Sequence, residues 1–140
     1  MSAKFFLDTN LFVYSLGGTP AAKARRAAEL VREAISSRNG IISYQVVQEF
    51  FSVAFRRFTP PMTLAEAESY LASVFRPLLA VHSSQALLAD ALRLCERYRL
   101  SWYDSLIVAA ALEAQCGVLY SEDMRHGQRF GDLRIDNPFR

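Results

Sequence analysis

Short apolar runs alternate along this chain with longer segments in which apolar residues recur every three or four positions. An uninterrupted apolar run of a few residues is typical of a strand covered on both faces, whereas the longer spacing is typical of amphipathic helices. The runs predict strands at residues 5–7, 41–43, 78–81, 117–120 and 133–135. Strands and helices that alternate in this way predict a single α/β domain, with a mainly parallel central sheet of four to five strands flanked by helices.

The segments of helical period have recognisable ends. Pro20 is positioned to open a helix over residues 21–37, and Asn39-Gly40 is typical of a turn. Thr63 and Glu66 have the spacing of a capping box, and Ser83 or Ser84 is expected to cap a helix that runs to about residue 98. Residues 106–114 are apolar nearly all round, which predicts a buried central helix.

The strongest helical pattern covers residues 44–58. Its apolar face consists of Val47, Phe50, Phe51, Ala54, Phe55 and Phe58. Four large aromatic side chains exceed what one face toward a core requires, so part of this helix is expected to cover something outside the domain. The alternative is a helix that is covered on both sides by its own domain.

Composition limits the class of protein. The chain has 140 residues, of which 51% are hydrophobic and 21% are charged, values that suit one compact domain without disulfides. Cys95 and Cys116 lack metal-binding spacing and are expected to be core residues in a reducing compartment. No stretch has the length or apolarity of a signal sequence or a membrane span, so we expect a cytoplasmic protein without membrane contacts.

The positive charge consists almost entirely of arginine: 14 of the 16 basic residues are Arg. The guanidinium group binds phosphate through two parallel hydrogen bonds, which the lysine ammonium cannot do. A GC-rich genome produces the same excess. The arginine content is therefore a hint, and no more, of a phosphate-bearing partner.

Four acids fall where a parallel sheet collects its ligands, beyond the carboxyl ends of the strands. Asp8 follows the first predicted strand and Asp123 the fourth. Asp104 begins the buried central helix, and Glu49 lies one to two turns into the helix after the second strand. We expect the four carboxylates to point into one crevice.

Each acid also has a structural interpretation. Asp8 is a good helix cap, and Asp104 stands three residues after Ser101, the spacing of a capping box. Glu49 suits a polar helix face, and Asp123 suits a turn. Taken singly, none of the four is specific for catalysis.

Taken together, the four acids point to a bound cation. Two like charges about 4 Å apart repel by about 4 kcal/mol at an effective dielectric constant near 20, so such a crevice needs a cation or protonated acids. Neither His82 nor His126 has zinc-type spacing, and an all-oxygen set of ligands selects Mg²⁺ or Mn²⁺. Hydrolysis of phosphodiester bonds is the chemistry that such a site suits.

The residues at these positions resemble a known family. LDTN after the opening strand, a Glu in an apolar helix, YDSLI entering a buried helix and YSEDM after a later strand are similar to the PIN domain. In particular, they resemble the VapC-type toxin ribonucleases of type II (VapBC) toxin–antitoxin systems. The similarity extends over residues 1–140, in the order and at the spacings of that family.

The resemblance implies a function and a role for each residue. Asp8, Glu49, Asp104 and Asp123 would hold Mg²⁺, or Mn²⁺, which activates water for endonucleolytic cleavage of structured RNA. The implied supporting polar residues are Asn10, Ser105 and Ser121. Glu122 is a further acid beside Asp123, and the sequence alone does not choose between the two.

Contacts with RNA follow from the same interpretation. Basic residues that could reach phosphates are Lys23, Arg25, Arg26, Arg56, Arg57, Arg125 and Arg129. Tyr14, Tyr44, Trp102 and Tyr103 could stack on unpaired bases, although core packing is the commoner role of such residues. The sequence leaves DNA open as a substrate, because no residue identifies a reader of the 2′-hydroxyl.

The resemblance also implies partners: a cognate VapB-type antitoxin whose apolar segment lies beside the helix of residues 44–58, and a second copy in a homodimer that forms through other helices. The main alternative is a catalytically inert PIN-like module that binds RNA or protein. A phosphatase of the haloacid dehalogenase type is a weaker alternative, because Asn10 stands where its second acid would be.

Overall fold

The computed structural model describes residues 3–140. Its strands are β1 (Phe5–Leu7), β2 (Gly40–Ser43), β3 (Leu79–Val81), β4 (Val118–Tyr120), β5 (Arg129–Phe130) and β6 (Leu133–Asp136). Its helices are α1 (Thr9–Ser15), α2 (Ala21–Ser37), α3 (Tyr44–Arg56), α4 (Leu64–Tyr70), the π-helical turn η1 (Leu71–Phe75), α5 (Arg76–Leu78), α6 (Gln85–Tyr98) and α7 (Trp102–Glu113).

The strands form one sheet in the order β3-β2-β1-β4-β6-β5. All neighbouring pairs are parallel except β5 with β6, which are antiparallel. The predicted single α/β domain with a mainly parallel sheet is therefore confirmed. The sequence predicted four to five strands and the sheet has six, because β5 is only two residues long and leaves no apolar run to recognise.

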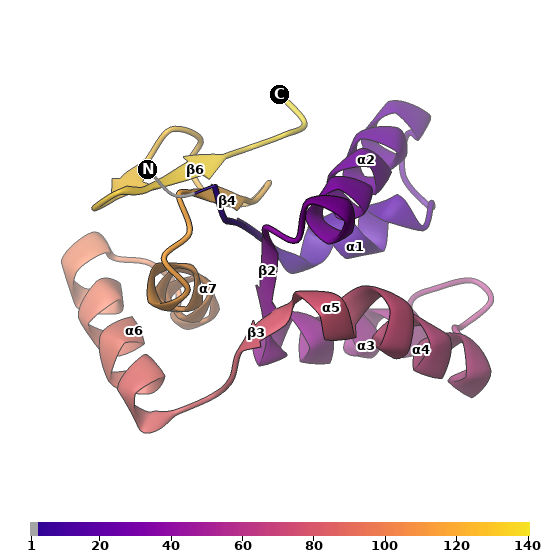
Figure 1. Cartoon of the computed structure of the whole chain (residues 1–140), viewed down its shortest axis with the longest axis horizontal. Helices are drawn as coiled ribbons and strands as arrows, with labels where there is room; N and C mark the ends of the chain where they lie inside the picture. Colours follow the sequence, from indigo (N-terminus) through magenta and orange to yellow (C-terminus); the bar gives the residue numbers. More distant parts are fainter. Residues whose placement is uncertain (1–2) are drawn as a thin grey trace.

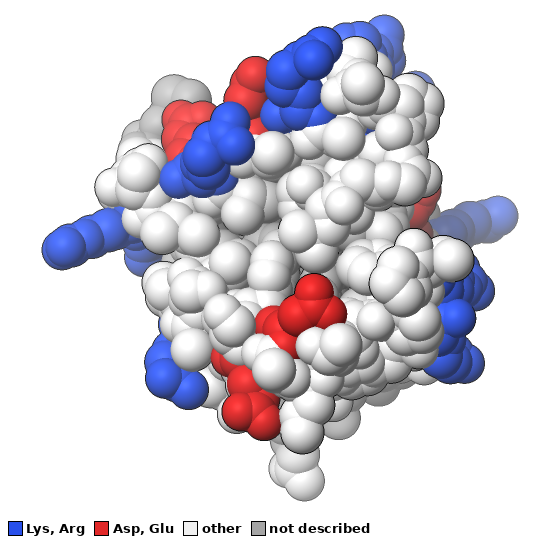
Figure 2. Space-filling model, turned by 90° about the vertical axis from the view of Figure 1, so that its right-hand side faces the viewer, with Lys and Arg blue, Asp and Glu red and all other residues white. Residues whose placement is uncertain are grey.

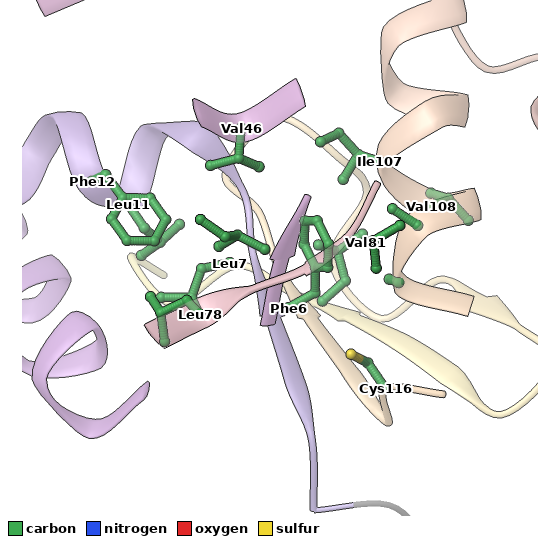
Figure 3. Packing of buried hydrophobic residues seen from close by; sticks show 14 of the residues in the cluster. Phe6, Leu7, Leu11, Phe12, Val46, Leu78, Val81, Ile107, Val108 and Cys116 are labelled. Carbon is green, nitrogen blue, oxygen red and sulfur yellow. The ribbon is translucent and has the colours of Figure 1, made fainter. Parts of the chain in front are cut away.

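Helices cover both faces of the sheet (Figure 1). α1 and α2 lie on one side of the sheet, and α6 and α7 lie on the other. Phe6 and Leu7 of the central strand β1 are fully buried between them, among the apolar side chains in Figure 3. The prediction of a buried central helix is confirmed by α7, in which residues 107–111 are all buried.

The connection from α2 to β2 differs from the predicted Asn39-Gly40 turn. Arg38 is the residue with left-handed backbone (φ 63°), and Gly40 already belongs to β2. Gly40 is required for a different reason, since a Cβ there would lie 2.2 Å from the Cβ of Ala34 on α2. The glycine therefore allows α2 to approach the sheet closely.

Most of the helix ends follow the predicted chemistry. Thr63 and Glu66 form the predicted capping box, with Thr63 Oγ1 accepting from Glu66 N at 3.1 Å and Glu66 Oε1 accepting from Thr63 N at 2.9 Å. Ser84, one of the two predicted serines, caps α6. Among the helices of residues 3–140, none combines the length and apolarity that a membrane span requires.

Candidate active site

A cleft of about 190 Å³ lies at the carboxyl ends of the central strands. It contains Asp8, Glu49, Asp104 and Asp123, the four acids singled out in the sequence. The rest of its lining is Thr9, Asn10, Gln45, Val53, Tyr103 and Ile107. A water molecule occupies about 30 Å³ in the liquid, so the cleft has room for several.

Asp8 is held in place by the alignment of two strand ends. β1 pairs with β4 so that Leu7 lies opposite Tyr120, and the residues that follow, Asp8 and Ser121, meet side by side. Asp8 Oδ2 accepts a hydrogen bond from the Ser121 hydroxyl at 2.8 Å, and Oδ1 accepts from the amide of Thr9 at 2.7 Å. Asp8 therefore caps α1 and faces the cleft at the same time.

The ionised form of Asp8 is electrostatically unfavourable in this position. Its side chain is buried, with the residue only 8% exposed. Burial raises the pKa of Asp8 from 3.8 to about 6, the two hydrogen bonds lower it, and the charges of Glu49 and Asp104 raise it further. A buried acid among other acids is typical of a site in which the acid binds a cation or stays protonated.

Glu49 reaches the cleft from α3, the helix that follows β2. Its Oε1 accepts a hydrogen bond from the Thr9 hydroxyl at 2.6 Å, and its Oε2 accepts a longer one from Gln45 Nε2 at 3.4 Å. Thr9 thus contacts two acids, one through its amide and one through its hydroxyl. Neither Thr9 nor Gln45 stands out in the sequence as a site residue, although the four-residue spacing of Gln45 and Glu49 on one helix predicts contact.

Asp104 enters the cleft from the first turn of α7. Its amide donates to the hydroxyl of Ser101, the residue that caps this helix, at 3.2 Å. That is half of a capping box, and within residues 3–140 the Asp104 carboxylate accepts no hydrogen bond from the Ser101 amide. The carboxylate is therefore available to the cleft.

Ser105, one of the expected supporting residues, does not contact the acids. It is fully buried, and its hydroxyl donates to the carbonyl of Ser101 at 2.8 Å and accepts from the Cys95 thiol at 3.0 Å. Its position in α7, one residue after Asp104, turns its side chain toward α6 rather than toward the cleft. Asn10 and Ser121, by contrast, do contact acids of the cleft.

The structure separates Asp123 from Glu122. Asp123 lines the cleft and accepts a hydrogen bond from Asn10 Nδ2 at 3.0 Å. Glu122 points toward α1 and α2, where it accepts hydrogen bonds from the Tyr14 hydroxyl and from Lys23, with which it forms an ion pair. Adjacent side chains point in opposite directions here, so Asp123 is the acid that belongs to the cleft.

The contact of Glu122 with Lys23 is expected to stabilise the loop that carries Asp123. The ion pair is partly buried, and the Lys23 ammonium lies 4.8 Å from the centroid of the Tyr14 ring. Lys23→Ala is expected to lower the free energy of unfolding by about 1–2 kcal/mol, because Glu122 loses a charged donor. Urea denaturation measures this, with Lys23→Arg as the variant that keeps the charge. Equal stability of Lys23→Ala and the wild type would contradict it.

Few of the predicted RNA-contacting residues lie beside the cleft. Arg26 pairs with Glu29 at 3.6 Å, Arg56 bonds to Ser52 of its own helix, and Arg129 lies beside Gly117 and Val118, at the opposite end of β4. Arg25 and Arg125 are exposed, and Arg57 lines a groove that adjoins the cleft. Of the predicted stacking residues, Tyr14 contacts Lys23, whereas Tyr103 lines the cleft itself.

The four acids line the same cleft, but they do not form a preformed metal-binding site. Within residues 3–140, no three His, Cys, Asp or Glu side chains stand in a group that could hold a metal as they are placed. Neutral donors hold three of the acids instead: Thr9 and Ser121 bind Asp8, Thr9 and Gln45 bind Glu49, and Asn10 binds Asp123. The oxygen-only chemistry and the room in the cleft fit a hard divalent cation.

Comparison with protein families assigns the fold. The family model of the PIN domain matches residues 5–129, which is most of the chain. The chain belongs to the PIN-domain family. No curated protein matches the sequence at a significant level.

Solved structures of toxin–antitoxin proteins share the fold of this PIN domain. A toxin–antitoxin complex from Klebsiella pneumoniae superposes with a TM-score of 0.69 at 16% identity, covering 96% of this chain and 98% of the other. VapC20 of Mycobacterium tuberculosis, described as a sarcin–ricin loop cleaving toxin, gives 0.62 at 20% identity, with 86% and 90% covered. VapBC2 from Rickettsia felis, bound to a promoter DNA fragment, gives 0.59 at 18% identity, with 94% and 96% covered.

Proposed function

We propose that this PIN domain is an Mg²⁺-dependent endoribonuclease that acts as the toxin of a toxin–antitoxin pair and cleaves structured RNA. The observation that carries the proposal is the convergence of Asp8, Glu49, Asp104 and Asp123 on one cleft at the carboxyl ends of the sheet. PIN-domain nucleases generally depend on divalent metals, and the structures with this fold include a toxin described as cleaving the sarcin–ricin loop.

The four acids of the cleft are the proposed ligands of the cation. A bound divalent ion supplies the positive charge that activates water and stabilises the leaving oxygen of a phosphodiester. Thr9 and Ser121 fix both oxygens of Asp8, and Asn10 orients Asp123. Val53 and Ile107 form an apolar wall of the cleft, which lowers the local dielectric constant and strengthens the interaction of these carboxylates with a cation.

The alternative function is a catalytically inert module that binds RNA or protein. Such a module has no use for a buried carboxylate with a raised pKa next to two further acids. Neutral replacements at these positions would relieve the repulsion at no cost to binding. The retained acids therefore favour the enzyme.

Mapping of RNA ends tests the proposed activity. Purified protein incubated with total RNA and Mg²⁺ is expected to cut one or a few sites in stable structured RNAs such as tRNA or rRNA. Chelation of the metal with EDTA, or the substitution Asp104→Asn, is expected to remove these new ends. Asp132→Asn, at an exposed acid outside the cleft, is the matched control. Cuts scattered evenly over messenger RNA would contradict the proposed substrate, and cuts that persist in EDTA would contradict the metal.

A groove beside the cleft is the proposed site of the antitoxin. It has a volume of about 680 Å³, and its lining includes Val13, Leu16 and Gly17 from the region of α1, together with Val53 and Phe58 from the region of α3. Val53 and Asn10 line both the groove and the cleft, so the two adjoin. The right-hand side of Figure 1, where α1 and the α3–α4 connection lie, faces the viewer in Figure 2.

The charge distribution on this face suits an apolar segment. Uncharged groups cover most of the face in Figure 2, Asp and Glu form small patches near its centre, in its lower part and at its upper left, and Lys and Arg lie along its upper and side margins. An antitoxin segment with apolar residues and flanking acids would complement it, with one polar group that enters the cleft. Less of the aromatic face of α3 is available to the antitoxin than the sequence indicated. Phe50 is buried against Tyr70 and Phe75, and among the four phenylalanines of this face only Phe55 is exposed.

The proposed homodimer has a separate surface. Leu88 and Leu92 are exposed four residues apart on α6, and Leu112 is exposed on the neighbouring α7. Such a stripe is typical of a helix that packs against a second copy. Light scattering of the purified protein tests it, and a monomer at micromolar concentration would contradict it.

A further inference from the structure

A second, smaller pocket opens beside the catalytic cleft. It has a volume of about 120 Å³ and lies between the start of α3, the β3–α6 connection and the first turn of α7. Gln45 and Tyr103 line both the pocket and the cleft, and Gln45 Nε2 donates to the carbonyl of Tyr103 at 3.1 Å. The pocket and the cleft therefore lie on either side of this one hydrogen bond, close enough for a single RNA strand to reach both.

Aromatic rings form the rim of this pocket. Tyr44 is 43% exposed and Tyr103 is 63% exposed, unusually large fractions for tyrosines that lie beside a cavity. His82 packs edge-on against Tyr44, with ring centroids 4.6 Å apart and planes at 83°. Exposed ring faces in this arrangement are suited to stacking on a flat ligand.

One residue of the pocket lining has an unpartnered hydroxyl. Ser43 lines the pocket and is only 3% exposed, yet its Oγ has no hydrogen-bond partner, a unique case among the buried side chains of residues 3–140. Ser43 precedes α3 but its side chain does not cap the helix. A buried hydroxyl without a partner is unfavourable, and a ligand that supplies the partner removes this cost.

We propose that this pocket holds an unpaired nucleobase of the RNA strand whose neighbouring phosphate lies in the catalytic cleft. This inference rests on the proposed nuclease function and adds to it a determinant of sequence preference. Tyr44, His82 and Tyr103 supply stacking surfaces, and the Ser43 hydroxyl and Gln48 amide supply hydrogen bonds to the base edge. The lining includes no Asp, Glu, Lys or Arg, so it suits a neutral, flat, hydrogen-bonding group better than a phosphate or a charged side chain of a protein partner.

Selection from a pool of RNA hairpins with a randomised loop tests the proposal. The catalytically inactive Asp8→Asn protein is used for binding, and the bound RNAs are sequenced. This protein is expected to select one base at one loop position. Adding Tyr44→Ala is expected to remove that preference and to weaken binding by about 5- to 150-fold, the range for loss of one base–aromatic stack. Tyr44→Phe keeps the ring and is expected to keep the preference.

Ser43→Ala separates recognition from folding. It removes the unpartnered hydroxyl, so the melting temperature is expected to stay the same or rise while base selection is lost or altered. Ser36→Ala, at an exposed serine of α2, is the matched control and is expected to change neither property. Because Ser43→Ala is not expected to weaken the fold, the test remains decisive if Tyr44→Ala is unstable.

Two outcomes overturn the base pocket without affecting the nuclease. One is an unchanged base preference in Ser43→Ala and Tyr44→Ala while the wild type cuts the same pool in Mg²⁺. The other is loss of inhibition by the antitoxin in these variants with base preference unchanged, which assigns the pocket to a protein partner. A pool that the wild type does not cut and Asp8→Asn does not bind overturns both proposals.

Discussion

Replacing Asp8 by Asn is expected to abolish RNA cleavage and to raise the free energy of unfolding of the ion-free protein. Cleavage is lost because a neutral amide is a poor ligand for a divalent cation. Stability rises because the amide removes a buried charge that faces Glu49 and Asp104. The amide oxygen can still accept from Thr9 N, and the Ser121 hydroxyl can turn to accept from the amide nitrogen, so the capping of α1 is preserved.

The gain in stability is expected to depend on pH in a defined direction. The pKa of Asp8 is about 6 in the folded protein and 3.8 in the reference state, so the folded state binds the proton more tightly. The contribution of Asp8 to stability is therefore fully present below pH 4 and is lost as the pH rises through 6. The two pKa values correspond to a difference of at most about 3 kcal/mol. Asp8→Asn should match the wild type near pH 4 and exceed it at pH 7.

Urea denaturation in EDTA at several pH values measures this effect, with Asp132→Asn as the control at an exposed acid. Mg²⁺ is expected to narrow the difference, because it stabilises only the protein that binds it. An Asp8→Asn protein that is less stable than the wild type at pH 7 would show that Asp8 is a structural cap. Normal cleavage by this variant would remove Asp8 from the proposed ligand set.

Co-expression with the small protein encoded beside this gene is expected to give a tight complex without nuclease activity. The groove between α1 and the end of α3 adjoins the catalytic cleft at Asn10 and Val53. A segment bound in the groove therefore excludes RNA from the acids by the same contacts that provide affinity. Leu16→Asp places a charge at an apolar position of the groove lining and is expected to weaken the complex by more than about tenfold.

The measurement is titration of each purified toxin variant with the antitoxin while RNA cleavage is followed. Leu64→Asp is the matched control, because Leu64 is exposed on α4 and lies outside the groove. Its inhibition curve should coincide with that of the wild type. Inhibition of Leu16→Asp at the same antitoxin concentration as the wild type would place the partner elsewhere on the surface.

The fold was predictable from the sequence because its strands are apolar runs and its helices have clear ends. The runs at residues 5–7 and 117–120 mark β1 and β4, whose pairing aligns Asp8 with Ser121. β5 was missed because two residues carry no pattern. Gly40 was interpreted as a turn residue because its actual constraint, close contact with Ala34 of α2, exists only in three dimensions.

The acids of the cleft were predictable from their places after strands and at helix starts, but the side chains that hold them were not. Glu122 and Asp123 are adjacent in sequence, and only the positions of Tyr14 and Lys23 show which one faces away. Ser105 resembles a site residue in sequence and instead bonds to Ser101 and Cys95. The unpartnered hydroxyl of Ser43 is a property of its surroundings, so no local pattern indicates it.

The central claim is that the cleft of four acids cleaves RNA with the aid of a divalent cation. The most direct test compares the rate at which the wild type, Asp104→Asn and Asp132→Asn cut one RNA hairpin, each in Mg²⁺ and in EDTA. The wild type and Asp132→Asn should cut at equal rates in Mg²⁺ and not at all in EDTA, and Asp104→Asn should be inactive in both. Cleavage by Asp104→Asn at the wild-type rate, or cleavage by the wild type in EDTA, would contradict the claim.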